Sequence, residues 1–193
     1  MSVATESVSE SKQSGLRTAG VGAVSGLGAA LLGYLLTYLA TSGTIENSTA
    51  SQVLEALGSG LPTWKVVGWV FLNAHGVATT FPGLFGTTSS ANLVEQFEAF
   101  SALLYAVPVV TLVATGAAIA VAHGASSVQT GVVAGAATVV GYLPVIVAGL
   151  ALFSVTVGDA VARPDPVTAV LLAGLAYPVF LGGVGGAVAA ALR

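Results

Sequence analysis

The sequence predicts an all-α fold, a polytopic bundle of transmembrane helices with five spans. Hydrophobic residues make up 55% of the 193 residues and charged residues only 7%, and the mean hydropathy is +0.93. A soluble domain carries roughly 25% charged residues, because polar side chains must cover its core. A lipid bilayer instead solvates long uncharged segments, provided that each helix satisfies its own amides.

The composition also argues against several classes of function. The net charge is −3 without a basic cluster, so no nucleic-acid partner is expected. The absence of cysteine excludes disulfides, cysteine-ligated zinc and iron–sulfur clusters. The two histidines have no nearby acid, so neither a metal nor a cofactor is expected. Without a nucleophile elbow, a close carboxylate pair or a His-Glu-x-x-His motif, the chain is not expected to be an enzyme.

The N-terminal quarter is predicted to contain a tail, a span and a surface helix. Residues 1–17 are polar and predict a short disordered tail. The first span follows at about 19–40, with Tyr34 and Tyr38 near its far end, where aromatic rings favour the membrane interface. Apolar residues at helical spacing then predict a short amphipathic helix at about 50–57. This helix lies either on the membrane surface or on the bundle.

The second apolar stretch has two interpretations. Residues 66–81 alone reach only about 24 Å, whereas residues 64–84 are long enough to cross the membrane. A span over 64–84 is favoured and gives five spans in all. The alternative is a re-entrant segment shielded by protein, which leaves four spans.

Three more spans are predicted in the second half of the chain. They lie at about 99–122, 130–155 and 166–192. Asn92 with Glu95 three residues later predicts the start of a helix that continues into the first of these. Asp165 followed by Pro166 is an N-cap with a proline at the first helical position, which marks the start of the last span.

Each of these three spans carries a proline preceded by a tyrosine. The predicted kink prolines are Pro108, Pro144 and Pro178, and the tyrosines are Tyr105, Tyr142 and Tyr177. A proline inside a helix frees a carbonyl one turn earlier, so three facing kinks would form a vestibule lined by tyrosine hydroxyls. The simpler interpretation is that the prolines only shape the bundle.

Asn73 and His75 are strongly polar side chains inside a predicted span, and with the three tyrosines they form the candidate site. An intramembrane polar residue is a functional candidate by default. His75 either relays protons or binds a ligand, or it hydrogen-bonds a backbone carbonyl or one of the tyrosines. No carboxylate lies within a predicted span, which argues against an ion-coupled transporter.

Glycine pairs with GxxxG spacing predict close helix packing. The pairs are Gly22–Gly26, Gly131–Gly135 and Gly182–Gly186. Each places two small residues on one helix face, one turn apart, so that backbones can approach closely. The spacing does not distinguish packing within the chain from packing between chains. Besides the lipid bilayer, a second copy or another membrane protein therefore stays open as a partner.

Charges around the first span predict the orientation in the cell membrane. Lys12 and Arg17 precede this span, and no positive charge follows it before Lys65, so the positive-inside rule predicts a cytoplasmic N-terminus. The C-terminus lies outside with five spans and inside with four. Asn47 begins a glycosylation acceptor pattern, which agrees with an outside loop.

The stretch Trp64-Lys65-Val66-Val67-Gly68-Trp69-Val70-Phe71-Leu72-Asn73-Ala74-His75 is distinctive. Together with the Ser/Glu-rich tail and the Ala/Val/Gly-rich spans, it resembles a family of uncharacterised small membrane proteins of halophilic archaea. The resemblance implies a multi-span protein of the cell membrane and no established activity.

Two functions are open on the sequence alone. The favoured one is a non-enzymatic accessory or structural subunit of a membrane assembly, because buried charge and catalytic motifs are absent and the GxxxG faces suit association. The alternative is a small transporter or channel for a neutral or weakly polar solute, which would use the three prolines and the pair Asn73 and His75.

Overall fold

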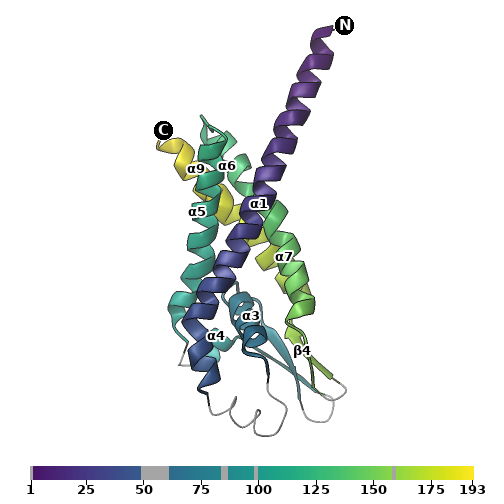
Figure 1. The fold of residues 1–193 in the computed structure, drawn as a ribbon, viewed down its shortest axis with the longest axis vertical. Coiled ribbons are helices and arrows are strands. Elements are labelled where there is room, and N and C mark those ends of the chain that lie inside the picture. The colour runs from purple at the N-terminus through teal and green to yellow at the C-terminus, as the bar shows by residue number, and fades with distance from the viewer. Residues whose placement is uncertain (1, 49–60, 84–86, 98–99, 158–159) are drawn as a thin grey trace.

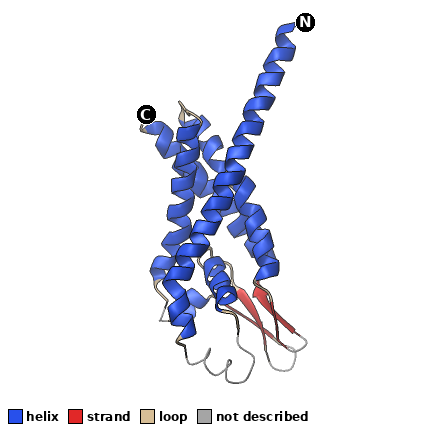
Figure 2. Ribbon diagram, viewed as in Figure 1, coloured by secondary structure: helices blue, strands red, loops and turns tan. Residues whose placement is uncertain are grey.

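A bundle of long helices with a small sheet at one end makes up the protein (Figures 1 and 2). The computed structural model describes residues 2–48, 61–83, 87–97, 100–157 and 160–193, with side chains from residue 15 onward. Within these residues, 4 helical stretches are long and apolar enough to cross a membrane: Gly15–Glu46, Ala102–Ala122, Val128–Leu152 and Pro166–Ala191. Both chain ends lie at the end of the bundle opposite the sheet (Figure 1).

The first helix, α1, runs without interruption from Ser2 to Glu46. At 1.5 Å per residue it is about 68 Å long, and its N-terminal part projects beyond the other helices (Figure 1). This differs from the predicted disordered tail over residues 1–17. The segment contains no proline, and Gly15 is its only glycine. Because helix formation is costly mainly at nucleation, the apolar helix that follows can propagate into it.

The segment predicted as the second span is too short to cross a membrane, so the described residues contain four helical stretches of sufficient length and not the five predicted. Helix α3, Thr63–Asn73, has 11 residues and reaches only about 16 Å, half of a hydrocarbon core. The chain then reverses at Gly76, whose φ of 77° is a left-handed conformation that glycine adopts easily. The segment therefore enters and leaves the bundle on one side, as in the four-span alternative. The predicted surface helix at 50–57 lies outside the described residues.

The sheet at the end of the bundle corrects the all-α prediction. Its strands are β1 Thr79–Pro82, β2 Thr88–Ala91, β3 Val155–Val157 and β4 Ala160–Pro164. They are ordered β2-β1-β4-β3, and each neighbouring pair is antiparallel. Thr79 pairs with both Ala91 and Pro164, so the sheet joins two distant parts of the chain. Strands this short show little alternation of polar and apolar residues in the sequence. The residue pairs that stabilise such a sheet join different strands, so the sequence of one strand does not reveal them.

The third predicted span begins later than the sequence suggests. The pieces are α4 Leu93–Gln96, η2 Ala102–Tyr105 and α5 Ala106–Ala122. Asn92 caps α4 as predicted, since its side-chain oxygen accepts the Val94 N–H at 3.0 Å. However, α4 does not continue into the bundle, because Phe97 is extended and Ser101 caps a new 3₁₀ turn that leads into α5.

The last two apolar stretches coincide with the predicted spans 130–155 and 166–192. Their elements are α6 Val128–Ala136, α7 Val139–Leu152, α8 Pro166–Thr168, the π-helical η3 Ala169–Ala176 and α9 Tyr177–Ala191. Asp165 caps α8 as predicted, since its carboxylate accepts the Thr168 N–H at 2.8 Å. In the wide η3 turn, the Tyr177 N–H reaches back to the Leu172 carbonyl, and π-helical turns of this kind are frequent at functional sites.

The three predicted kink prolines occupy different positions in their helices. Pro144 lies inside α7, where it removes one intrahelical hydrogen bond. Pro108 lies in the first turn of α5, where an N–H has no intrahelical α-partner in any case. Pro178 lies in the first turn of α9, directly after the π-helical segment.

The predicted GxxxG faces pack against helices of the same chain. A Cβ on Gly135 would lie 2.0 Å from the carbonyl oxygen of Gly182, and one on Gly131 would lie 2.3 Å from that of Gly186. The two pairs therefore bring the backbones of α6 and α9 together. The third pair, Gly22 and Gly26 of α1, faces the carbonyls of Ala137 and Thr138 at 2.3 and 2.0 Å from their would-be Cβ atoms.

Candidate functional site: a buried polar centre beneath the sheet

His75 lies fully buried in the turn between α3 and β1. Its Nδ1 is 2.8 Å from the Phe71 carbonyl oxygen, and its Nε2 is 2.7 Å from the Tyr142 hydroxyl. A carbonyl can only accept, so Nδ1 carries the hydrogen and Nε2 accepts from Tyr142. In this tautomer of the neutral imidazole, both ring nitrogens are hydrogen-bonded.

Two of the three predicted tyrosines contact His75. Tyr142 of α7 is itself fully buried, and Tyr177 brings its ring to 5.1 Å from the imidazole, centroid to centroid. The Phe71 ring packs edge-on at 4.8 Å. The turn after α3, the middle of α7 and the junction of η3 with α9 therefore meet at this histidine.

Asn73 joins α3 to the sheet and to α4. Its amide nitrogen donates to the Val77 carbonyl at 2.6 Å and to the Thr79 hydroxyl at 3.1 Å. Its amide oxygen accepts the Leu93 N–H at 2.9 Å. The side chain is fully buried, so these bonds hold three segments of backbone at one point.

Tyr105, the third predicted tyrosine, belongs to a separate cluster. Its hydroxyl lies 3.0 Å from the Asn92 amide nitrogen and 3.1 Å from a carboxylate oxygen of Glu95. The Asn92 amide also reaches the Asn73 carbonyl, at 3.4 Å. The candidate site is thus two linked clusters rather than one vestibule of three tyrosines. The sequence predicted only that Asn92 and Glu95 begin a helix. Their hydrogen bonds to Tyr105 depend on the sheet, which was not predicted.

Two cavities lie at opposite ends of the bundle. An apolar one of about 450 Å³ lies between α1, α3 and α7, with Tyr34, Trp64 and Phe153 among its lining residues. The other, of about 550 Å³, surrounds His123 near the end that carries the chain termini. In the described part of the chain, no three His, Asp or Glu side chains come together as a metal site would require.

A family of unknown function matches the chain from residue 1 to residue 193. The chain belongs to this family, DUF7978. No curated protein matches the chain, and no solved structure matches it. The match covers the four helical stretches, the sheet and the polar centre of the DUF7978 chain alike.

Burial determines the charge state of His75 in this DUF7978 protein. The residue lies in the α3–β1 turn, outside the four long helices, and desolvation of the imidazolium lowers its pKa to about 4, although the Phe71 carbonyl opposes the shift. His75 is therefore neutral at physiological pH. The neutral imidazole donates to the Phe71 carbonyl of α3 and accepts from the Tyr142 hydroxyl of α7. These two hydrogen bonds link the two helices.

Acidification is expected to destabilise the protein through His75. The unfolded chain binds a proton at this histidine below pH about 6.5, whereas the folded chain binds it only near pH 4. The free energy of unfolding should thus fall by about 3 kcal/mol between pH 7 and pH 4. Thermal unfolding in detergent, followed by circular dichroism across this range, measures the effect. His75→Gln should show a flatter profile, and parallel profiles for the two proteins would contradict the assignment.

Proposed function

We propose that this DUF7978 protein is a non-enzymatic, four-span subunit of a membrane assembly with an accessory or structural role. The observation that argues against a solute path, and so for a role without transport, is the direct backbone contact of α5, α6 and α9. A Cβ on Gly116 of α5 would lie 2.0 Å from the Gly182 carbonyl, the same carbonyl that faces Gly135 of α6. Backbones this close leave no space for a solute between the three helices.

The hydrogen bonds of the polar centre also support a structural role. Both nitrogens of His75 and both amide atoms of Asn73 bind groups of the same chain. A buried polar group that is satisfied in this way fixes a unique packing.

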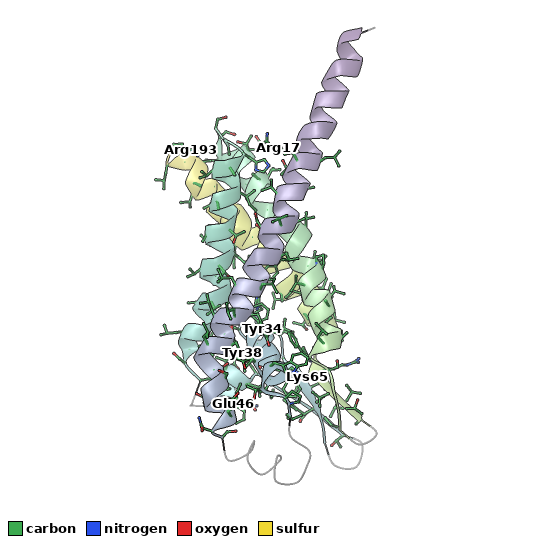
Figure 3. The ribbon with its side chains drawn as sticks, in the orientation of Figure 1. Arg17, Tyr34, Tyr38, Glu46, Lys65 and Arg193 are labelled. Atoms are coloured by element: carbon green, nitrogen blue, oxygen red, sulfur yellow. The ribbon has the colours of Figure 1, made fainter. Side chains whose placement is uncertain are left out.

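The proposed location is the cell membrane with a cytoplasmic N-terminus. Arg17 and Arg193 lie at one end of the bundle, and Glu46 and Lys65 lie at the other (Figure 3). Four crossings bring the two arginines to the same side, which the positive-inside rule assigns to the cytoplasm. An origin in halophilic archaea is a further proposal, supported by the resemblance of the stretch from Trp64 to His75.

Transport of a small neutral solute is the second candidate function. It is favoured by the π-helical segment η3, which is followed directly by Tyr177 beside His75. A wide turn next to a proline provides a place where a helix can repack. Such a movement would have to open a path from the polar centre to both sides of the membrane.

Solute flux through proteoliposomes tests the proposed function. Stopped-flow light scattering with glycerol or urea should give the same rate for protein-containing and protein-free vesicles. In parallel, mild-detergent extraction of native membranes should yield the protein in a complex larger than the monomer. A faster rate that His75→Ala abolishes would support transport instead, and a monomer without flux would refute both functions.

A further inference from the structure

The apolar cavity between α1 and α7 is a groove that opens on the outer surface of the bundle. The two helices diverge toward the sheet end (Figure 1), and α3 closes the space between them from within. Leu27 and Leu31 of α1 form one wall, Pro144 and Ala148 of α7 form the other, and Phe71 of α3 lies at the back. The groove therefore runs along the two helices, within the apolar part of the protein.

Aromatic rings line the sheet end of this groove, and one cation lies beside them. Tyr34 stacks on Phe153 with 5.7 Å between ring centroids, and Trp64 meets the same ring edge-on at 6.2 Å. Lys65 places its ammonium 5.3 Å from the centroid of the Trp64 ring, and it donates to the Ser154 carbonyl at 2.7 Å. Tyrosine and tryptophan favour the level of the lipid headgroups. An ammonium has three donors, so the bond to Ser154 leaves others for a ligand.

We infer that this groove binds one hydrocarbon chain of a phospholipid and that Lys65 binds its anionic headgroup. A chain that moves from bilayer to groove gains little hydrophobic energy, because lipid tails are as apolar as the groove. Selectivity must therefore come from the polar end of the lipid, and Lys65 lies beside Trp64, a lining residue at that end of the groove. A volume of about 450 Å³ suits a small ligand or a single chain, whereas a helix about 10 Å across would not fit.

Tryptophan fluorescence reports directly on this site. Trp64 is 41% exposed and lines the groove, whereas Trp69 is 2% exposed. Brominated acyl chains quench a tryptophan that they contact, so quenching by lipid follows occupancy near Trp64. In phosphatidylcholine bilayers, brominated phosphatidylglycerol should quench at a lower mole fraction than brominated phosphatidylcholine. One cation near the membrane surface predicts about fivefold selectivity.

Two pairs of variants separate the groove from general effects of charge and bulk. Lys65→Gln should remove the selectivity, whereas Arg163→Gln, which changes an exposed cation of β4, should retain it. Ala148→Phe should reduce quenching by filling the groove, and Val147→Phe, on the neighbouring exposed position of α7, should not.

Equal quenching by the two lipids in the unchanged protein would overturn the inference. The same loss in Arg163→Gln as in Lys65→Gln would also overturn it, because the preference would then reflect charge at the sheet end in general. If neither lipid quenches Trp64, the groove is covered by protein, such as a second copy, and the lipid assignment is wrong. The proposed subunit role is tested independently, by the flux and extraction experiments.

Discussion

Gly182→Ala is expected to lower the free energy of unfolding by about 3 kcal/mol. A Cβ at this position would lie 2.5 Å from the Gly135 carbonyl oxygen and 3.2 Å from the Thr138 hydroxyl. The nearer atom belongs to backbone, which cannot rotate away as a side chain would, so α9 must move from α6. Unfolding in mixed detergent and dodecyl sulfate micelles, followed by circular dichroism, measures the change.

The neighbouring glycine provides the matched control for this substitution. A Cβ on Gly183 would meet a methyl group of Val132 at 3.5 Å, an ordinary van der Waals contact. Gly183→Ala should therefore be neutral or stabilise by up to about 1 kcal/mol, because alanine has the higher helix propensity. Equal losses in the two variants would show that the α6–α9 contact is looser than the structure has it.

Asn73→Leu should destabilise the fold by about 4 kcal/mol, although the side chain keeps its size. The change removes the donor to the Val77 carbonyl and the acceptor of the Leu93 N–H, at a buried position. Each polar group left unsatisfied costs roughly 1–3 kcal/mol. Because the lost bonds join β1 and α4 to α3, hydrogen exchange of the β1 amides should also accelerate.

The same chemistry at an exposed position is the control. The side chain of Asn47 is exposed and donates to the Gly43 carbonyl at 2.7 Å. Water replaces such a bond, so Asn47→Leu should change the free energy of unfolding by less than about 0.5 kcal/mol. If Asn73→Leu changes the free energy of unfolding as little as this, the hydrogen bonds of Asn73 do not hold the sheet to the bundle. The structural role of the polar centre would then be wrong.

The long apolar helices were predictable because hydropathy over about 20 residues is a local property. Asp165 and Asn92 likewise carried local capping signals, and both cap helices in the structure. Hydropathy alone could not reveal that α3 is covered by protein instead of lipid. Phe71 and Leu72 are at most 3% exposed, yet in sequence such residues resemble those of a span.

The candidate site was only partly predictable for a related reason. His75 and Tyr142 do meet, and a buried histidine that binds a carbonyl and a tyrosine was one of the two interpretations of the sequence. Tyr105 was assigned to the same vestibule because it also precedes a proline. Its actual partners, Asn92 and Glu95, depend on where α4 lies, and α4 is positioned by Asn73 and the pairing of β1 with β2.

The pairing of β1 with β4 sets an order for biogenesis. Thr80 pairs with Arg163, so the ribosome makes β1 and α3 well before the strand that completes their sheet. During that interval α3 has α1 beside it but lacks Tyr142 and Phe153, which come with α7. Until α7 is made, the apolar helix α3 therefore lacks part of the protein that buries Phe71 and Leu72. Early termination after α5 would leave the apolar side of α3 that faces α7 uncovered.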